Sequence, residues 1–210
     1  MRNKHRLLFG LLVACLLCPA LPGDGQAAAK KKTKTKDGIA YVRISLPEEV
    51  EWEVNPDEKL ARGGIIQWLV AGYSAKDTPA KVLYQQVKPA KPAGELQMLI
   101  DKSLDDCPDV DMGPFQGSSK YHDQINIEAI CSRLGEERFG VQSFISIFSD
   151  NEANHVVIAE VRTPVAEKAG ELNYRNPVMK QQVETSRVFS DLLYKLMHDI
   201  RVCDAKDLCI

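Results

Sequence analysis

The sequence has few of the residues from which metal sites and hydrolytic centres are built. It contains no CxxC pair, the spacing typical of cysteine zinc sites, and four histidines in 210 residues. The segment closest to a nucleophile elbow, Gly72–Lys76, has a lysine where the second glycine belongs, and no helix is predicted after it. We therefore assign no catalytic residue, no metal ligand and no cofactor, and of the histidines outside the leader His155 and His198 are expected to be surface or core residues.

The chain also lacks an apolar run long enough to cross a membrane. Leu7–Leu17 has eleven apolar residues, whereas a bilayer needs about 20. It follows the positively charged start MRNKHR and precedes two prolines and the small residues Ala27-Ala28-Ala29. This pattern is typical of a secretory signal peptide, so we expect residues 1–29 to be removed by cleavage after Ala29.

The alternative is lipidation at Cys15. The segment Leu12-Val13-Ala14-Cys15 resembles the lipobox of bacterial lipoproteins, in which the cysteine becomes the acylated first residue. Two observations count against it: Leu16 and Leu17 continue the apolar run, and cleavage before Cys15 would retain Cys18 as an unpaired thiol. We expect a periplasmic or secreted protein, which would reach the membrane only if it is lipidated at Cys15.

Positive charge is scarce outside one short tail. Residues 30–38, KKKTKTKDG, carry five lysines and no apolar residue, which predicts a flexible basic tail. Residues 1–38 together hold eight of the basic and two of the acidic residues, so residues 39–210 have 19 Lys and Arg against 27 Asp and Glu, a net charge of −8. Nucleic acids require a basic face, so we exclude them as partners. The length of residues 39–210 predicts a single domain.

Four cysteines remain after the predicted cleavage: Cys107, Cys131, Cys203 and Cys209. Four cysteines permit three pairings, and a metal site is the functional alternative. Cys203 and Cys209 flank a short segment after a predicted helix, whereas Cys107 lies in an acidic loop and Cys131 ends a predicted strand. We expect the disulfides Cys203–Cys209 and Cys107–Cys131, because export places the chain where disulfides persist.

Alternating or continuous apolar residues predict seven strands. They cover residues 39–46, 50–54, 65–73, 82–87, 125–131, 141–148 and 155–161. The segment 65–73 is nearly all apolar, which predicts a central strand covered on both faces. The last three strands are separated by short turns and are expected to form an antiparallel meander.

Apolar residues at helical spacing predict two helices. The first covers Gly94–Asp105, after which the segment around Pro108, Gly113 and Pro114 is expected to be a loop. The second covers Lys180–Val202, with a stripe of seven apolar residues: Val188, Phe189, Leu192, Leu193, Leu196, Met197 and Ile200. We expect this stripe to pack on the sheet, since an exposed stripe of that length invites aggregation; a partner-binding face is the alternative.

Two further clusters have a functional and a structural interpretation. Trp52, Trp68, Tyr73 and Tyr84 lie close together in the sequence and could line a groove for a ligand or peptide, although aromatics on alternating strands more often pack in a core. The acidic run that begins at Asp105 suggests a calcium loop, but Gly113 and Lys120 stand where oxygen ligands belong. We expect an ordinary acidic loop.

The order of these elements resembles the PsbP-like fold, found in the PsbP proteins of photosynthetic membranes and in bacterial exported proteins of the DcrB and LpqN kinds. The segments that carry the resemblance are VRISLPEEVEWEV, VLYQQV with ELQMLIDKSL, HVVIAEV and FSDLLYKLMHDIRV. It covers about Ile39 to Val202. The resemblance implies an α+β fold, an α/β/α sandwich whose mainly antiparallel sheet is packed by a mid-chain helix and a long C-terminal helix.

Members of that family are mostly non-enzymatic accessory or binding proteins. We therefore expect an exported, non-enzymatic protein that binds an unidentified envelope or exported protein. The first alternative is an exported inhibitor or immunity protein against a toxin or hydrolase, which a protruding acidic loop at Asp101–Gly117 would favour. The second is a hydrolase whose site the sequence does not reveal.

Overall fold

A computed structural model describes most of the chain beyond the predicted leader and tail. The described residues are Ile39, 41–92, Glu95, Leu96, Met98, Ile100, Asp101, Cys107, 109–116, 124–132, 139–165, 176–204 and Cys209. The predicted signal peptide with Cys15 and the predicted basic tail lie outside them.

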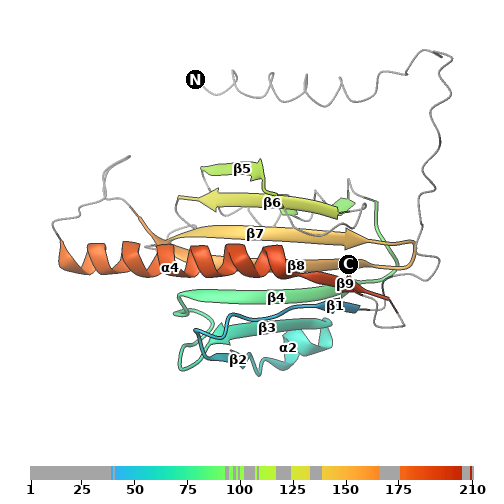
Figure 1. Cartoon of the computed structure of the whole chain (residues 1–210), viewed down its shortest axis with the longest axis horizontal. Helices are drawn as coiled ribbons and strands as arrows, with labels where there is room; N and C mark the ends of the chain where they lie inside the picture. The colour runs from blue at the N-terminus through green and yellow to red at the C-terminus, as the bar shows by residue number, and fades with distance from the viewer. Residues whose placement is uncertain are drawn as a thin grey trace, which may run out of the picture. The chain divides into compact units, whose positions relative to one another are not determined.

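The described residues form a seven-stranded sheet in which every neighbouring pair of strands is antiparallel (Figure 1). In spatial order its strands are β2 Trp52–Val54, β3 Ile65–Val70, β4 Ala80–Val87, β8 Asn154–Pro164, β7 Phe139–Ser149, β6 Gln124–Cys131 and β5 Val110–Pro114. A second, two-stranded sheet pairs β1 Tyr41–Arg43 with β9 Arg201–Cys203. With the helices α2 Glu58–Arg62 and α4 Pro177–Asp199, the fold is α+β, as predicted.

The predicted meander of three strands is confirmed by the neighbouring strands β6, β7 and β8. Side chains alternate between the two faces along a strand, and β7 places Phe144 and Phe148 on one face and Ile145 and Ile147 on the other. All four are buried. Because both faces of β7 are covered, its sequence reads as an almost continuous apolar run.

One face of the sheet is covered by α4 together with β1 and β9. The main core lies between these layers: Ala80, Val82, Phe115, Phe144, Phe148, Val157, Ala159, Val161, Leu193, Leu196, Met197, Ile200 and Val202. Val42, Ile44 and Leu46 pack against it from the N-terminal segment, the side that their alternation predicts.

The other face is covered by the segment 95–101, whose described residues are helical. Leu96 and Ile100, four residues apart, pack against Ile145 and Ile147. The predicted mid-chain helix is thus confirmed in its described part, while residues 102–106 lie outside it. The sheet therefore has helical layers on both faces.

Helix α4 begins and ends three residues earlier than predicted. Asn176 caps it by accepting a hydrogen bond from the backbone of Val178, and Pro177 occupies the first turn, where no partner for its nitrogen is needed. The helix ends at Asp199, because Arg201–Cys203 pairs with β1 as a strand. Val188, expected in the packed stripe, is 57 % exposed.

Three more local expectations differ from the structure. The segment expected to be a loop contains β5, whose residues 110–114 pair with β6 at the edge of the sheet. Strand β3 ends at Val70 and is second from the edge of the sheet, next to β2. It is not covered on both faces, because Ile66 is 42 % exposed. The short helix α2, capped by Asp57, was not anticipated.

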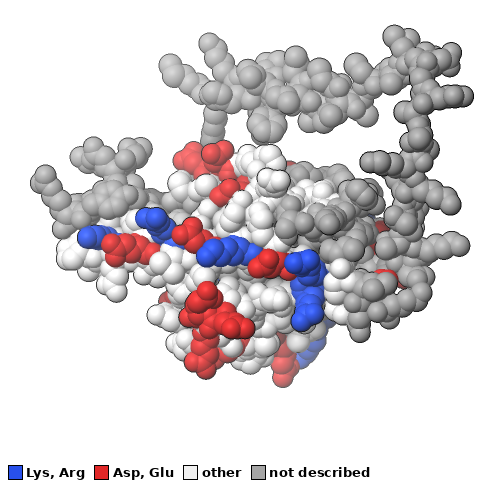
Figure 2. All heavy atoms as spheres, in the orientation of Figure 1, with Lys and Arg blue, Asp and Glu red and all other residues white. Residues whose placement is uncertain are grey.

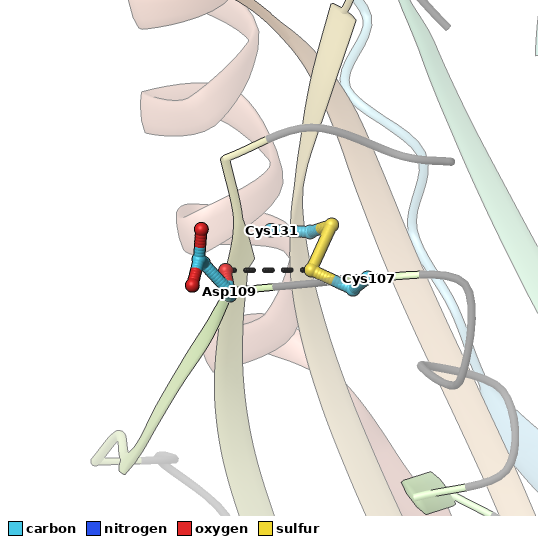
Figure 3. Close-up of a disulfide and its surroundings, with 3 residues drawn as sticks. All are labelled: Cys107, Asp109 and Cys131. Carbon is cyan, nitrogen blue, oxygen red and sulfur yellow. Dashed lines mark hydrogen bonds between the residues drawn. A yellow bond between two sulfur atoms is a disulfide. The ribbon is translucent and has the colours of Figure 1, made fainter. Parts of the chain in front are cut away.

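Both predicted disulfides are present. Cys107–Cys131 ties the segment before β5 to the end of β6, and the Sγ atom of Cys107 lies 3.4 Å from the carbonyl oxygen of Asp109 (Figure 3). Cys203–Cys209 closes a short loop after β9. The first bond thus holds an edge of the large sheet and the second holds the strand that pairs with β1.

Candidate functional site

The first half of α4 contains no buried residue. The helix has three buried residues, Leu193, Leu196 and Met197, all in its last two turns. Its first turns extend past the strand ends (Figure 1). This half of α4 therefore projects past the ends of the strands, and its residues are exposed or half-buried.

A cleft of about 470 Å³ lies beside this projecting half. Its lining comes from four places: the turn after β3, the start of β7, the end of β8 and the first half of α4. The lining residues are Tyr73, Asp77, Pro79, Phe139, Arg162, Thr163, Pro164, Gln181, Gln182, Thr185 and Ser186. The volume is in the range of sites that hold small ligands.

The turn between β3 and β4 places Tyr73 and Asp77 at the cleft. Gly72 has φ +81°, a left-handed conformation that a side chain disfavours, and it directs the chain into Tyr73. The Ser74 hydroxyl donates a 2.5 Å hydrogen bond to the Asp77 carboxylate. This local bond stabilises the turn, and it gives Ser74 a structural role.

Gly140 is required where β7 passes between its neighbours at the cleft. A Cβ atom at this position would lie 2.5 Å from the carbonyl oxygen of Cys131 and 2.6 Å from the hydroxyl oxygen of Thr163. Both distances are shorter than side-chain packing allows. The absence of a side chain at Gly140 therefore leaves room for Thr163, which lines the cleft.

Among the described residues, the lining of the cleft contains one positive and one negative side chain. The Arg162 guanidinium lies 3.9 Å from the centre of the Phe139 ring, a cation–π contact. The Asp77 carboxylate accepts the Ser74 hydroxyl. With one charge of each sign, the formal charges of the described lining residues cancel.

The outward face of α4 bears charges of alternating sign (Figure 2). They are Lys180, Glu184, Arg187, Asp191, Lys195 and Asp199, all exposed. Mixed charges at this spacing produce no extended field of one sign. This face is therefore a solvated helix surface. The face of α4 that lines the cleft differs from it, because its described side chains are uncharged.

Of the four aromatic residues proposed for a groove, Tyr73 lines the cleft and the other three do not. Trp52, Trp68 and Tyr84 are partly buried and pack against the main core. The Trp52 indole donates to the carbonyl oxygen of Pro47 at 3.1 Å, and the Tyr84 hydroxyl lies 2.9 Å from Nδ1 of His155. Tyr73 alone of the four is more than a third exposed, at 48 %.

His155 is fully buried beside Tyr84, and its Nε2 atom has no hydrogen-bond partner among the described residues. Burial lowers the pKa of His155; the nearby Asp150 opposes this shift and Lys88 adds to it. Burial also raises the pKa of Tyr84. His155 is therefore a core residue, one of the two positions expected for it.

Asp150 joins the turn between β7 and β8 to the N-terminal segment. One carboxylate oxygen accepts hydrogen bonds from the backbone of Glu152 and Ala153, both 2.7 Å, and the other accepts from Ile39 at 2.6 Å. Burial works to raise the pKa of Asp150, but these three donors and the nearby His155 outweigh it and hold the pKa below its usual value. This turn is thus stabilised by a charged group that is fully engaged.

The described part of the chain offers neither a metal-binding cluster nor a membrane-spanning helix. Within it, no three His, Cys, Asp or Glu side chains come together in a way that could hold a metal ion. In the same residues, no helix is both long and apolar enough to cross a membrane. His122 lies outside the described residues.

Sequence reasoning did not identify most of the cleft, although one signal was present. The apolar stripe of the last helix starts at Val188, whereas the helix begins at Pro177. A helix whose first three turns lack a packed stripe must either project or carry a polar contact surface. Combining that gap with the position of Tyr73 at the end of a predicted strand would have pointed to this end of the sheet.

Comparisons with known proteins leave the family open. No family model matches the chain, and no curated protein matches it. Seven chains of solved structures match it, among them a point mutant of protein Mog1, with a TM-score of 0.47 and 8 % identity over 81 % of this chain and 97 % of that chain. A similarity at this level supports no conclusion about function, and the PsbP-like resemblance stays a prediction.

Proposed function

We propose that this chain is an exported, non-enzymatic binding protein that contacts an envelope component through the cleft beside α4. The carrying observation is the cleft itself: it is open to solvent and lined by Gln181, Gln182 and Thr185, which are exposed and have no side-chain hydrogen bond to other described residues. Polar groups without protein partners are available to a ligand. The PsbP-like resemblance, whose members mostly bind rather than catalyse, supports the same proposal.

Export is supported by two features of the chain. The leader has the positive start, short apolar run and small residues of a signal peptide. The two disulfides fit an oxidising compartment, since structural disulfides are rare in the cytosol. We propose a periplasmic or secreted protein that acts through a protein or another component of the envelope.

Affinity capture from envelope extracts tests the binding role. Wild type is compared with Thr185→Arg, which places a bulky cation in the cleft, and with Val188→Arg, which places the same group on the exposed side of α4 outside the cleft lining. We expect a component that wild type and Val188→Arg retain and Thr185→Arg loses. Equal retention by all three proteins would contradict the proposal, as would turnover of the retained component.

Mass spectrometry of the mature N-terminus tests the export route. A free amino terminus at Lys30 supports cleavage after Ala29 and a protein without a lipid anchor. An acylated Cys15 would replace that model by the lipoprotein alternative, in which residues 16–38 would link the lipid to the domain. The binding proposal stands under either result, because the cleft is formed by residues of the domain.

A further inference from the structure

We infer that the cleft binds a short, uncharged saccharide, an inference that rests on the proposed function and names the class of ligand. The cleft combines three features that saccharides require of a protein. They are charges that cancel among the described lining residues, several side chains that can both donate and accept hydrogen bonds, and a flat aromatic surface. Each comes from different residues of the cleft.

The charges favour a neutral ligand. Arg162 is held over Phe139 and Asp77 is bonded to Ser74, so both charged groups are already positioned by the protein. An anionic ligand would be attracted by Arg162 and repelled by Asp77, and a cationic ligand the reverse, so neither sign of charge gains a net attraction from the described lining. A saccharide without acidic or amino groups avoids both repulsions and can accept from the guanidinium and donate to the carboxylate.

The polar lining matches hydroxyl groups. The side chains of Gln181 and Gln182 each carry an amide with two donor hydrogens and an acceptor oxygen, and Thr163 and Thr185 each carry a hydroxyl that does both. The Ser186 hydroxyl donates to the carbonyl oxygen of Val183 and keeps its acceptor capacity. A sugar ring presents hydroxyls that also donate and accept, so it can satisfy this set in several orientations.

The apolar lining supplies a flat surface. Tyr73 is 48 % exposed at the rim, and Pro79, Phe139 and Pro164 form further rigid apolar walls. Aromatic side chains offer a large apolar face together with a polar edge at low cost in conformational entropy. The C–H face of a sugar ring can pack on Tyr73 while its hydroxyls reach the amides of α4.

The backbone around the cleft disfavours an extended peptide. Peptides that bind as added strands pair with unpaired backbone groups at the edge of a sheet. Here Phe139 pairs with Pro164 and Gly140 with Thr163 in the ladder of β7 and β8, and the Arg162 backbone donates to Pro79. The cleft therefore offers side chains and not a strand edge.

A binding measurement on the processed, full-length exported protein tests this inference. The probes are the uncharged trisaccharides of glucose, mannose, galactose and N-acetylglucosamine, with trigalacturonate and tri-alanine as the charged and peptide probes. Binding is followed by isothermal titration and by amide chemical-shift changes in two-dimensional NMR. We expect at least one uncharged trisaccharide to bind and to shift the amides of Gln181, Gln182 and Thr185.

Variants locate the binding. Tyr73→Ala should weaken the affinity by ~10-fold or more, because it removes an aromatic contact and the area that this contact buries. Tyr73→Phe keeps the ring and should retain most of the affinity. Tyr41→Ala is the matched control, because Tyr41 is 40 % exposed and lies outside the cleft. Equal affinity of Tyr73→Ala and wild type would overturn the inference.

The outcomes separate this inference from the proposed function. No binding of any uncharged trisaccharide, or tighter binding of trigalacturonate or tri-alanine, overturns the saccharide inference. If Thr185→Arg still loses an envelope component in that case, the cleft is a binding site for another class of ligand. If the capture experiment also shows no difference among its three proteins, the proposed function is wrong as well.

Discussion

At the turn between β7 and β8 the polar side chains bond to the protein itself, whereas at the opposite ends of these strands, beside the first half of α4, they face solvent. At the turn, Asp150 accepts three backbone hydrogen bonds. Asn154, which is buried, accepts from the backbone of Lys91 at 2.6 Å and donates to the carbonyl oxygen of Lys91 at 3.3 Å and to Ser149 at 2.9 Å. At the cleft, the amides of Gln181 and Gln182 have no such partner among the described residues.

The difference indicates a division of roles between the two ends. Buried polar groups that are fully paired hold one arrangement of the chain and are costly to remove. Solvent-facing polar groups without protein partners contribute little to stability and are free to bind a ligand. We therefore expect substitutions at the turn to change stability, and substitutions at the cleft to change binding.

The two halves of α4 give the largest contrast. Leu193→Ala removes a side chain that is fully buried against the sheet, and we expect it to lower the free energy of unfolding by about 2–5 kcal/mol. Val188→Ala, in the projecting half, should change it by about 0.5 kcal/mol or less. Urea unfolding of both variants measures the values. Similar losses from the two would show that the first half of α4 is packed as tightly as the second.

The polar residues of the two ends give the next contrast. Asn154→Ala leaves the backbone of Lys91 and the hydroxyl of Ser149 without this partner, so we expect a loss of about 1–3 kcal/mol in the free energy of unfolding. Gln182→Ala at the cleft is the matched control and should cost about 0.5 kcal/mol or less. If Gln182→Ala were the more destabilising of the two, the assignment of roles to the ends would be reversed.

The turn end should also make stability depend on pH. Because burial lowers the pKa of His155 in the folded protein, the unfolded chain binds more protons when the pH falls below about 6.5, and stability decreases there by up to about 1.4 kcal/mol per pH unit. The lowered pKa of Asp150 acts separately: its contribution is present above its unfolded pKa of 3.8 and is lost as the pH falls further.

The variant His155→Gln isolates the first of these effects. It removes the titrating ring but keeps a polar group that can reach the Tyr84 hydroxyl. We expect the difference between its free energies of unfolding at about pH 7.5 and about pH 5.5 to be smaller than in wild type. His122 and His198 are present in both proteins and cancel in the comparison. An unchanged slope would show that His155 is not held neutral.

Hydrogen exchange should resolve the smallest contrast, which lies within α4. Residues 193–199 include the three buried residues of the helix, whereas residues 181–188 lie in the projecting half and include none. We expect faster exchange in the projecting half, because local opening there exposes little apolar surface. Uniform protection along the helix would contradict this, and ligand binding at the cleft should slow the exchange of residues 181–188 selectively.

Elements whose pattern is local were predictable from the sequence. The alternation of β6, β7 and β8 and the four-residue spacing of Leu96 and Ile100 both reflect which side chains face the core. The disulfide pairs followed from where the cysteines lie relative to the predicted elements: one pair joins a loop to the end of a strand, and the other closes a short segment after the last helix. The strand and helix signals depend on neighbours within a few positions of the chain.

Elements that depend on distant partners were not predictable. Arg201–Cys203 continues an apolar helical pattern, and only its pairing with Tyr41–Arg43 makes it a strand. β5 contains Gly113 and Pro114, which predict a loop, yet it pairs with β6 at an edge, where proline is tolerated. The cleft likewise needs the ends of three strands and a helix to meet, so no single segment of sequence carries its pattern.

Retention of an envelope component by two variants, measured side by side below their unfolding temperatures, tests the division of roles most directly. We predict that Asn154→Ala unfolds at a lower temperature than wild type but retains the component as wild type does. Thr185→Arg should unfold at the wild-type temperature and lose the component. Undiminished retention by Thr185→Arg would contradict the account, because the cleft beside α4 would then not be the binding site.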